Sequence, residues 1–235
     1  MDKDEVIKKL ERFACKDKWR TKILGVYVKG DRAYATDGAI AVVHDVDNDN
    51  KSDKIDDILA MQGDEREYPT DKIDDILAMS DSHGVRFSID KGQYEMAADE
   101  FLRKCSDERY NLVSANAKRY VRTECPGCGE ELYWDSESNR LVREYPDVDL
   151  DDRDVSMPVM IDFGDSGCVP VSFAYVYLVY GAFGPDIEVW PCKDKNGDRM
   201  LAMSGSDGKA TCVLMSLRLN YGYLPDCKLV TARIK

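Results

Sequence analysis

The stretch that decides the fold is Arg32-Ala33-Tyr34-Ala35-Thr36-Asp37-Gly38-Ala39-Ile40-Ala41. Its aromatic, β-branched and small apolar residues predict a strand over 33–43. A second strand is predicted upstream at 24–28, and Lys29-Gly30-Asp31 between the two supplies the residues of a hairpin turn. Before both strands, apolar residues at helical spacing over 4–16 predict an amphipathic helix. The first unit of the chain is therefore a helix packed on a hairpin.

The rest of the chain repeats this order of a helix followed by strands. Residues 169–183 begin with alternating apolar residues and end with helical spacing, so a strand leading into a helix is expected. Asn196-Gly197 is the strongest short hairpin signal. The other predicted elements are a helix at 91–105 and strands at 85–89, 118–123, 131–134, 141–145, 158–163, 187–192, 199–203 and 211–219. An α+β fold of repeated helix-plus-antiparallel-sheet units follows.

Two units are expected along the chain. The first covers 1–84 and includes an irregular acidic segment at 45–84. The second covers 85–235 and includes a hairpin insertion near 118–145 that carries a cysteine pair. Within the acidic segment, the nonapeptide Asp-Lys-Ile-Asp-Asp-Ile-Leu-Ala-Met occurs twice, at 53–61 and at 71–79. A local duplication accounts for the match, and each copy has the apolar spacing of a short helix. Two copies are too few for a solenoid.

Composition excludes several classes of protein. The 235 residues are 43% hydrophobic and 33% charged, which is typical of a soluble globular protein with a sizeable core. The longest apolar run, at 169–183, is too short for a membrane helix, and Met1–Glu5 lacks the layout of a secretory signal. The eight cysteines are scattered, as buried thiols would be, and do not form a disulfide framework. We therefore expect a cytoplasmic protein without a membrane partner.

Charge is distributed unevenly along the chain. The formal net charge is −12, which by itself argues against binding nucleic acid. However, residues 8–22 concentrate cations against only Glu11 and Asp17, and such asymmetry lets an acidic protein present one cationic face. A solvated helix face is the alternative interpretation. The cations are Lys8, Lys9, Arg12, Lys16, Lys18, Arg20 and Lys22.

Two segments resemble a known family. The stretch 32–41 resembles the Ala-Thr-Asp-Gly strand of bacterial and phage β-type DNA sliding clamps, the processivity factors of DNA polymerases, and Gly25-Val26 stands where that family has a Gly-Val strand. Val213-Leu214-Met215-Ser216-Leu217-Arg218-Leu219 resembles the strand that closes those clamps. The resemblance covers both ends of the chain and leaves the middle unmatched. The chain departs from the family where Gly38 is not followed by His-Arg and where Ser216 replaces Pro, and it has room for two domains instead of three.

The resemblance implies a function without catalysis. A clamp holds double-stranded DNA independently of sequence, tethers a polymerase or another replication protein, and closes as a ring, here a homo-oligomer. It implies that the cations at 8–22 face DNA. It also implies a partner-peptide pocket that includes Met215, Leu217 and Leu219, although packing in the core would explain these residues equally.

A cysteine pair supports a second hypothesis. Cys125-Pro126-Gly127-Cys128 has the sequence of a zinc knuckle, which directs two thiolates at one metal. Tetrahedral zinc needs four ligands, and Cys105, Cys168 or His83 would have to complete the set. With zinc bound, the chain would be a zinc-ribbon protein-interaction adaptor with no role on DNA. A metal-free hairpin turn is the simpler interpretation.

The remaining motifs are weaker indications of function. The acidic spacing over 45–56 imitates a calcium loop but lacks its Gly and its final Glu. Gly164-Asp165-Ser166-Gly167 imitates a serine-hydrolase turn, yet only His44 and His83 could serve as its base. No phosphate loop, zinc-protease or dinucleotide fingerprint occurs, so an enzyme is not expected.

Overall fold

A computed structural model describes residues 3–17, 19–46, 68–80, 85–124, 131–142, 151–217 and 228–234. The chain divides into a larger unit, 1–97 with 157–235, and a smaller unit, 98–156. These boundaries differ from the expected division at 84/85, because strands from both sides of that point pair in one sheet. Among the described residues no helix is long and apolar enough to cross a membrane.

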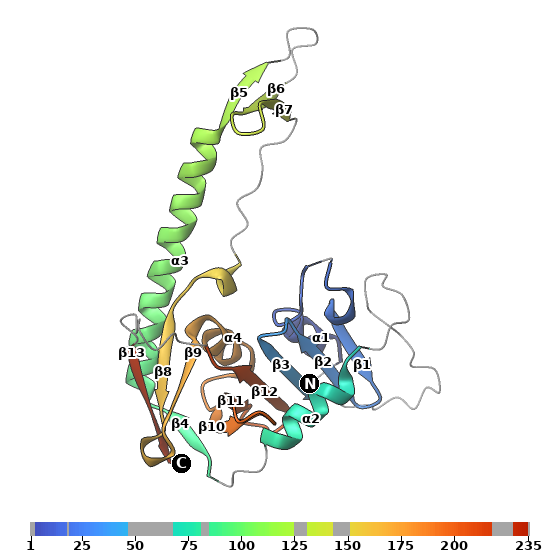
Figure 1. The fold of residues 1–235 in the computed structure, drawn as a ribbon, viewed down its shortest axis with the longest axis vertical. Helices are drawn as coiled ribbons and strands as arrows, with labels where there is room; N and C mark the ends of the chain where they lie inside the picture. Colours follow the sequence, from blue (N-terminus) through green and yellow to red (C-terminus); the bar gives the residue numbers. More distant parts are fainter. Residues whose placement is uncertain are drawn as a thin grey trace. The chain divides into compact units, whose positions relative to one another are not determined.

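The larger unit is built on a mixed sheet that comprises ten strands in the part of the chain described (Figure 1). All pairs are antiparallel except β13 with β8. Its strands, in spatial order, are β1 Val26–Lys29, β2 Arg32–Thr36, β3 Ile40–Asp45, β12 Ala210–Met215, β11 Arg199–Ser204, β10 Glu188–Lys193, β4 Phe87–Ile89, β13 Lys228–Ile234, β8 Pro158–Asp162 and β9 Cys168–Ser172.

Six of these strands are related by a pseudo-two-fold axis. The order β1-β2-β3-β12-β11-β10 is symmetric about the pair β3 and β12. In that pair Val42 lies opposite Cys212, Ala41 opposite Val213, and Val43 opposite Thr211. The Thr-Asp-Gly turn at 36–38, between β2 and β3, corresponds to Ser-Asp-Gly at 206–208, between β11 and β12. The predicted recurrence of a helix followed by antiparallel strands is confirmed, with three strands in each set, and so is the α+β class.

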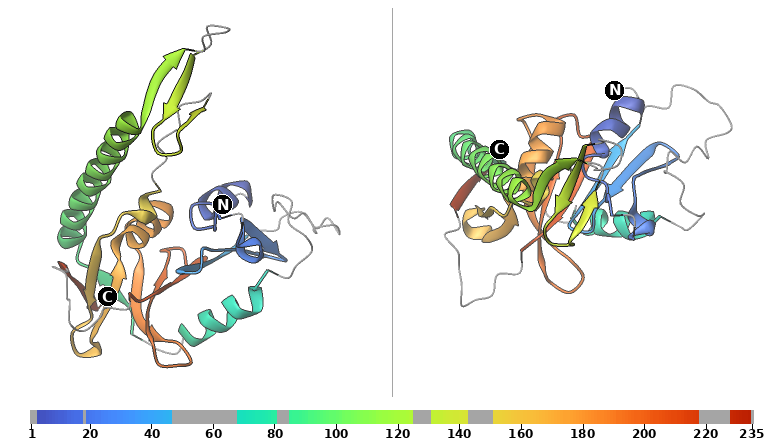
Figure 2. Two further views of the ribbon diagram at one scale, coloured as in Figure 1. Left: turned by 45° about the horizontal axis from the view of Figure 1, so that its top comes forward. Right: turned by 90° about the horizontal axis from the view of Figure 1, so that it is seen from above.

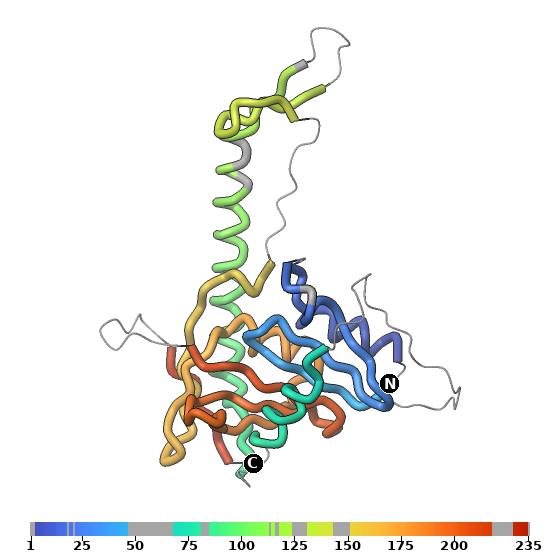
Figure 3. Tube along the Cα trace, turned by 45° about the vertical axis from the view of Figure 1, so that its right-hand side comes forward, coloured from blue at the N-terminus to red at the C-terminus, as the bar shows by residue number. Residues whose placement is uncertain are grey.

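Helices cover both faces of these six strands (Figure 2). The helices α1 (Lys3–Leu10) and α4 (Phe173–Phe183) each precede one set of three strands and lie on the same face. Phe13, just after α1, stacks on Phe183 at the end of α4 with ring centroids 5.9 Å apart. The opposite face carries α2 (Thr70–Ser80), which contacts β10 and β12 and packs Ile73 against β2 and β3 (Figure 3). The second nonapeptide copy is therefore helical, as predicted, and the first copy lies outside the described residues.

Two expected elements near the N-terminus are corrected. The helix ends at Leu10 and not at residue 16, because Phe13 and Cys15 turn into the core and the Cys15 N–H donates to the Thr36 carbonyl at 3.0 Å. The strand expected over 33–43 is two strands, since Asp37 and Gly38 form a turn between them. The short 3₁₀ helix Thr21–Ile23 connects α1 to β1.

Elsewhere the elements agree in kind and differ in their ends. The helix expected at 91–105 is α3, Lys91–Arg119, which continues because no Gly or Pro interrupts 106–119. The strand at 211–219 ends at Met215 among the described residues. The strand into helix at 169–183 is confirmed as β9 and α4. β13 was not predicted, although the alternation that buries Val230 and Ala232 is a strand signal.

The smaller unit contains the later part of α3 and a three-stranded antiparallel sheet. Its strands are β5 Tyr120–Glu124, β6 Glu131–Asp135 and β7 Arg140–Val142. Arg119 donates two hydrogen bonds to the carboxylate of the buried Asp135, at 2.8 and 2.9 Å. This hydrogen bonding, together with that from Ser138, holds the pKa of Asp135 well below its usual range. The unit also includes the 3₁₀ turn Asp152–Asp154, and a further one, Gly164–Ser166, joins β8 to β9 in the larger unit.

Candidate partner-binding pocket

The Ala-Thr-Asp-Gly turn is built from side chains that bond to their own backbone. Thr36 Oγ1 donates to the Ile40 carbonyl at 2.7 Å and accepts from the Gly38 N–H at 3.0 Å. Asp37 Oδ1 accepts from the N–H groups of Ala39 and Ile40, at 2.9 and 3.2 Å. Gly38 has φ = +95°, in the left-handed region that favours glycine. The residue types of this motif are therefore required by the turn itself.

Two more distant side chains fix this turn in place. Tyr175 on α4 donates from its hydroxyl to Asp37 Oδ2 at 2.8 Å. Arg20 donates to the Asp37 carbonyl at 2.6 Å, and its guanidinium lies so close to Gly38 that a Cβ there would overlap it. The turn is thus held rigidly between α4 and the loop after α1.

The segment that resembles the closing clamp strand lies beside this turn. Because β12 pairs with β3, Val213 lies opposite Ala41 and Leu214 opposite Ile40. The Met215 N–H donates to the Ala39 carbonyl at 2.9 Å. The two segments that carry the family resemblance, almost at opposite ends of the sequence, therefore meet at one place in the fold.

Helix α2 forms the opposite wall. Ile73 is 3% exposed and packs against Tyr34, Ala41 and Val43. Asp74 accepts a hydrogen bond from the Tyr34 hydroxyl at 3.3 Å and pairs with Arg32 at 3.5 Å. These contacts hold α2 so that Ile76 and Met79 face the turn.

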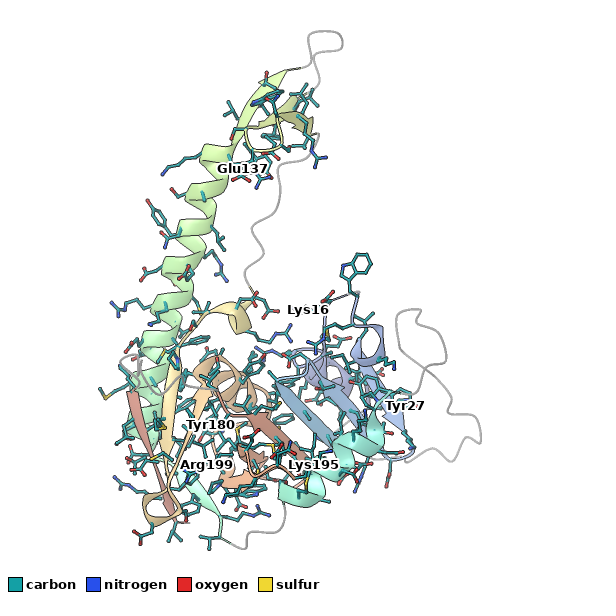
Figure 4. All side chains as sticks on the ribbon, viewed as in Figure 1. Lys16, Tyr27, Glu137, Tyr180, Lys195 and Arg199 are labelled. Atoms are coloured by element: carbon teal, nitrogen blue, oxygen red, sulfur yellow. The ribbon has the colours of Figure 1, made fainter. Side chains whose placement is uncertain are left out.

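Between these walls is a pocket of about 1030 Å³. Its lining is mostly apolar, with Ile23, Ala39, Ile76, Met200, Val213 and Met215 among its residues. Charged side chains of both signs also line it, namely the cations Arg20, Lys72 and Lys195 and the carboxylates Asp75 and Asp194. Figure 4 labels Lys195, in the turn between β10 and β11. An apolar pocket of this size with a few charged residues suits a short peptide with large apolar side chains.

Of the three residues expected to line a partner pocket, Met215 lines this one and is 50% exposed. Leu217 is not among the lining residues, and its N–H donates to the Pro170 carbonyl at 2.8 Å. Leu219 lies outside the described residues. Sequence reasoning missed the contribution of Thr36 to Ala41 and of α2. The apolar stripe of α2 could have indicated that this helix contributes to the pocket. The contribution of 36–41 could not be predicted, because the pairing of β3 with β12 is not visible in the sequence.

The cations expected to face DNA are not gathered on one helix face. Lys8 is exposed on α1, and Lys9 pairs with Glu5 at 3.5 Å. Arg12, Lys16 and Lys22 are exposed but lie beyond the end of α1. Figure 4 shows Lys16 in the loop after the helix. Arg20 donates to the Asp37 carbonyl of the turn described above, and Lys18 lies outside the described residues.

The cysteines expected to hold zinc, Cys125 and Cys128, lie outside the described residues, as does His83. Glu124 at the end of β5 lies opposite Glu131 at the start of β6, and the two cysteines fall between these residues in the sequence. Among the described residues no group of three or more His, Cys, Asp or Glu could hold a metal. Burial raises the pKa of the thiols of Cys105 and Cys168, the two other candidate ligands. Most of the calcium-like segment is likewise outside the described residues, and its first residue, Asp45, pairs with Arg32.

The serine turn has no catalytic neighbour in the part of the chain described. Ser166 is exposed between β8 and β9. His44 is 1% exposed on β3, and its Nδ1 lies 2.6 Å from the Asp45 carbonyl. Five other strands separate β3 from β8 in the sheet. His44 therefore does not serve Ser166 as a base.

Comparison with solved structures finds a likeness to a sliding clamp. No family model and no curated protein matches the chain. A crystal structure of the C. crescentus beta sliding clamp matches with a TM-score of 0.42 and 16% sequence identity over 93% of this chain. The chain spans 64% of that clamp chain's length.

Proposed function

We propose that this protein is a clamp-like, DNA-associated protein that captures a short peptide segment of a replication partner in the pocket between α2, the Thr36–Ala41 turn and β12. The observation that carries the proposal is the meeting of the two clamp-like segments at that pocket. The pseudo-two-fold sheet with paired helices on one face supports it, since clamps are built from such repeated units. The protein acts by binding, and its partner would be a polymerase or another replication protein.

A peptide selection tests the pocket. A random library of displayed decapeptides is selected against the intact protein and then screened against Met215→Glu. This substitution places a charge at an exposed residue of the lining, so it should leave the fold intact. We expect enriched peptides to contain large apolar residues and to lose at least about tenfold in affinity for the variant, because a buried carboxylate opposes apolar contact.

The matched control is Leu229→Glu, the same change at an exposed residue of β13 that does not line the pocket. Its affinity for the peptides should equal that of the unmodified protein. A selection that enriches no peptide, or peptides that bind Met215→Glu as well as Leu229→Glu, would contradict the proposal.

A second candidate function, a zinc-ribbon adaptor, is favoured by an exposed apolar row on the smaller unit. Val121, Trp134 and Leu141 are cross-strand neighbours on β5, β6 and β7, and they are 54%, 38% and 49% exposed. Such a row is typical of a protein-interaction surface. Elemental analysis of the purified chain should then give zinc that Cys125→Ser removes, and a zinc-free preparation would exclude this candidate.

A further inference from the structure

The contacts that hold α2 come largely from the duplicated nonapeptide. Ile73 and Leu77 pack on the cluster of Tyr34, Ala41 and Val43, and Asp74 bonds to Tyr34 and Arg32. We call the sheet surface under α2, formed by Arg32, Tyr34, Ala41 and Val43, the α2 seat. Residues 53–61 repeat the same nine residues, so Ile55, Asp56 and Leu59 carry the same side chains at the same spacing. Contacts made by the nonapeptide cannot distinguish one copy from the other.

The residues that flank the nonapeptide do distinguish the copies. Tyr68 stacks on Tyr27 with ring centroids 5.2 Å apart, where the first copy has Asn50. Ser80 is fully buried and its hydroxyl donates to the Leu77 carbonyl at 2.7 Å, where the first copy has the larger Gln62. At the helix start both copies have a hydroxyl residue, Thr70 or Ser52, which suits a helix cap. The second copy is favoured by its flanking contacts alone.

The first copy also has the reach to occupy the seat. The Val46 N–H donates to the Asp31 carbonyl at 2.7 Å, and Lys29 on the same hairpin reaches Thr70 at 3.3 Å. The end of β3 therefore lies near the start of α2. The linker 47–52 spans up to about 20 Å when extended. No strand of the sheet has to unpair for residues 53–61 to reach the seat.

We propose that the two copies compete within one chain for the α2 seat, with 71–79 as the major occupant and 53–61 as the minor one. Exchange would replace Ile76 and Met79 in the pocket wall by the identical Ile58 and Met61. The pocket would keep its lining while the intervening segment moved from one end of the helix to the other. This proposal rests on no part of the proposed function.

Amide hydrogen exchange, read by mass spectrometry on fragments identified by their different flanks, tests the exchange. Ile73→Asp buries a charge in the major occupant only. We expect protection of 71–79 to fall and protection of 53–61 to rise, each by at least about tenfold, independently of protein concentration. Ile55→Asp alone should change nothing, but added to Ile73→Asp it should abolish the transferred protection.

Tyr68→Asn provides an independent arm, because it weakens the flanking advantage without altering the nonapeptide. It should divide protection between the copies. Asp57→Lys is the matched control, since its counterpart Asp75 is exposed, and in the Ile73→Asp background it should leave the transferred protection intact. The proposal is overturned if the protection of 53–61 rises in neither Ile73→Asp nor Tyr68→Asn. Protection that grows with protein concentration would also overturn it, because the occupant would then come from a second copy of the chain.

Discussion

At the scale of single residues, Asp37 connects the turn to the rest of the larger unit. One carboxylate oxygen accepts two backbone N–H groups and the other accepts the Tyr175 hydroxyl. The predicted strand over 33–43 runs through Asp37 and Gly38, and no sequence pattern indicates that α4 supplies a partner 138 positions away. The candidate site was therefore only partly predictable at this scale: Met215 was identified, whereas Thr36 and Gly38 were recognised as a fold signature and not as pocket lining.

Asp37→Ala should lower the free energy of unfolding by about 1–3 kcal/mol, because it leaves two backbone N–H groups and a tyrosine hydroxyl without their acceptor. Urea denaturation followed by circular dichroism measures the loss. Asp207→Ala in the corresponding turn is the control, since its Oδ1 accepts from the Lys209 N–H at 3.0 Å and no tyrosine among the described residues bonds to it. Equal losses in the two variants would show that the link to α4 contributes nothing.

Asp135 should make the smaller unit sensitive to acid. Its folded pKa is depressed by Arg119, so its contribution to stability is complete above its ordinary pKa of about 3.9 and is lost as pH falls toward the folded pKa. Asp135→Asn should weaken the unit at neutral pH and remove this part of the acid sensitivity. The Trp134 indole resonance, followed by NMR from pH 7 to pH 2, reports on the unit. Identical acid midpoints in the two proteins would refute the assignment.

At the scale of elements, hairpins were the most predictable feature because their turns require particular residues. Gly30-Asp31 and Asn196-Gly197 identified their hairpins, and the confirmed change from strand to helix at 172–173 follows from a change of period. The end of α1 was not predictable, because tertiary burial of Phe13 and not a capping residue ends it. The order of the strands in the sheet could not be predicted either, since β3 pairs with a strand more than 160 residues later in the sequence.

Phe13→Ala tests the junction of the paired helices. Phe13 is 0% exposed and stacks on Phe183, so its truncation should lower the free energy of unfolding by about 3–5 kcal/mol. Met96→Ala, at a side chain that is 68% exposed, should cost little in the same urea titration. A Phe13→Ala loss no larger than that of Met96→Ala would mean that α1 and α4 do not share a core.

At the scale of the whole molecule, the charge distribution limits how the chain would hold DNA under the proposed function. The net charge is −12, and α4, which is the counterpart of α1, contains no Lys or Arg. If the proposed function holds, the cations that face DNA would come from residues 8–22, in the first half of the repeat, and not from α4. So few contacts would suit weak, sequence-independent association.

Binding to a 30-base-pair duplex, measured by fluorescence anisotropy, should weaken steeply with salt. If Lys8, Arg12, Lys16 and Lys22 each neutralise one phosphate, the slope of log K against log salt should be about −3 to −4. Replacing all four by Gln should abolish binding at low salt. Gln at four exposed cations elsewhere, Lys91, Arg103, Lys118 and Lys193, is the control and should leave it unchanged. Equal loss in both variants would show that no particular face contacts DNA.

The most direct test of the central claim, that the two clamp-like segments form one partner-binding pocket, is an NMR titration. The protein carries ¹³C-methyl methionine, and a peptide from the selection is added. We expect shifts at Met79, Met200 and Met215, which line the pocket, and none at the exposed Met96 or the buried Met157. Binding that shifts Met96 or Met157 and leaves the three pocket methionines unmoved would contradict it.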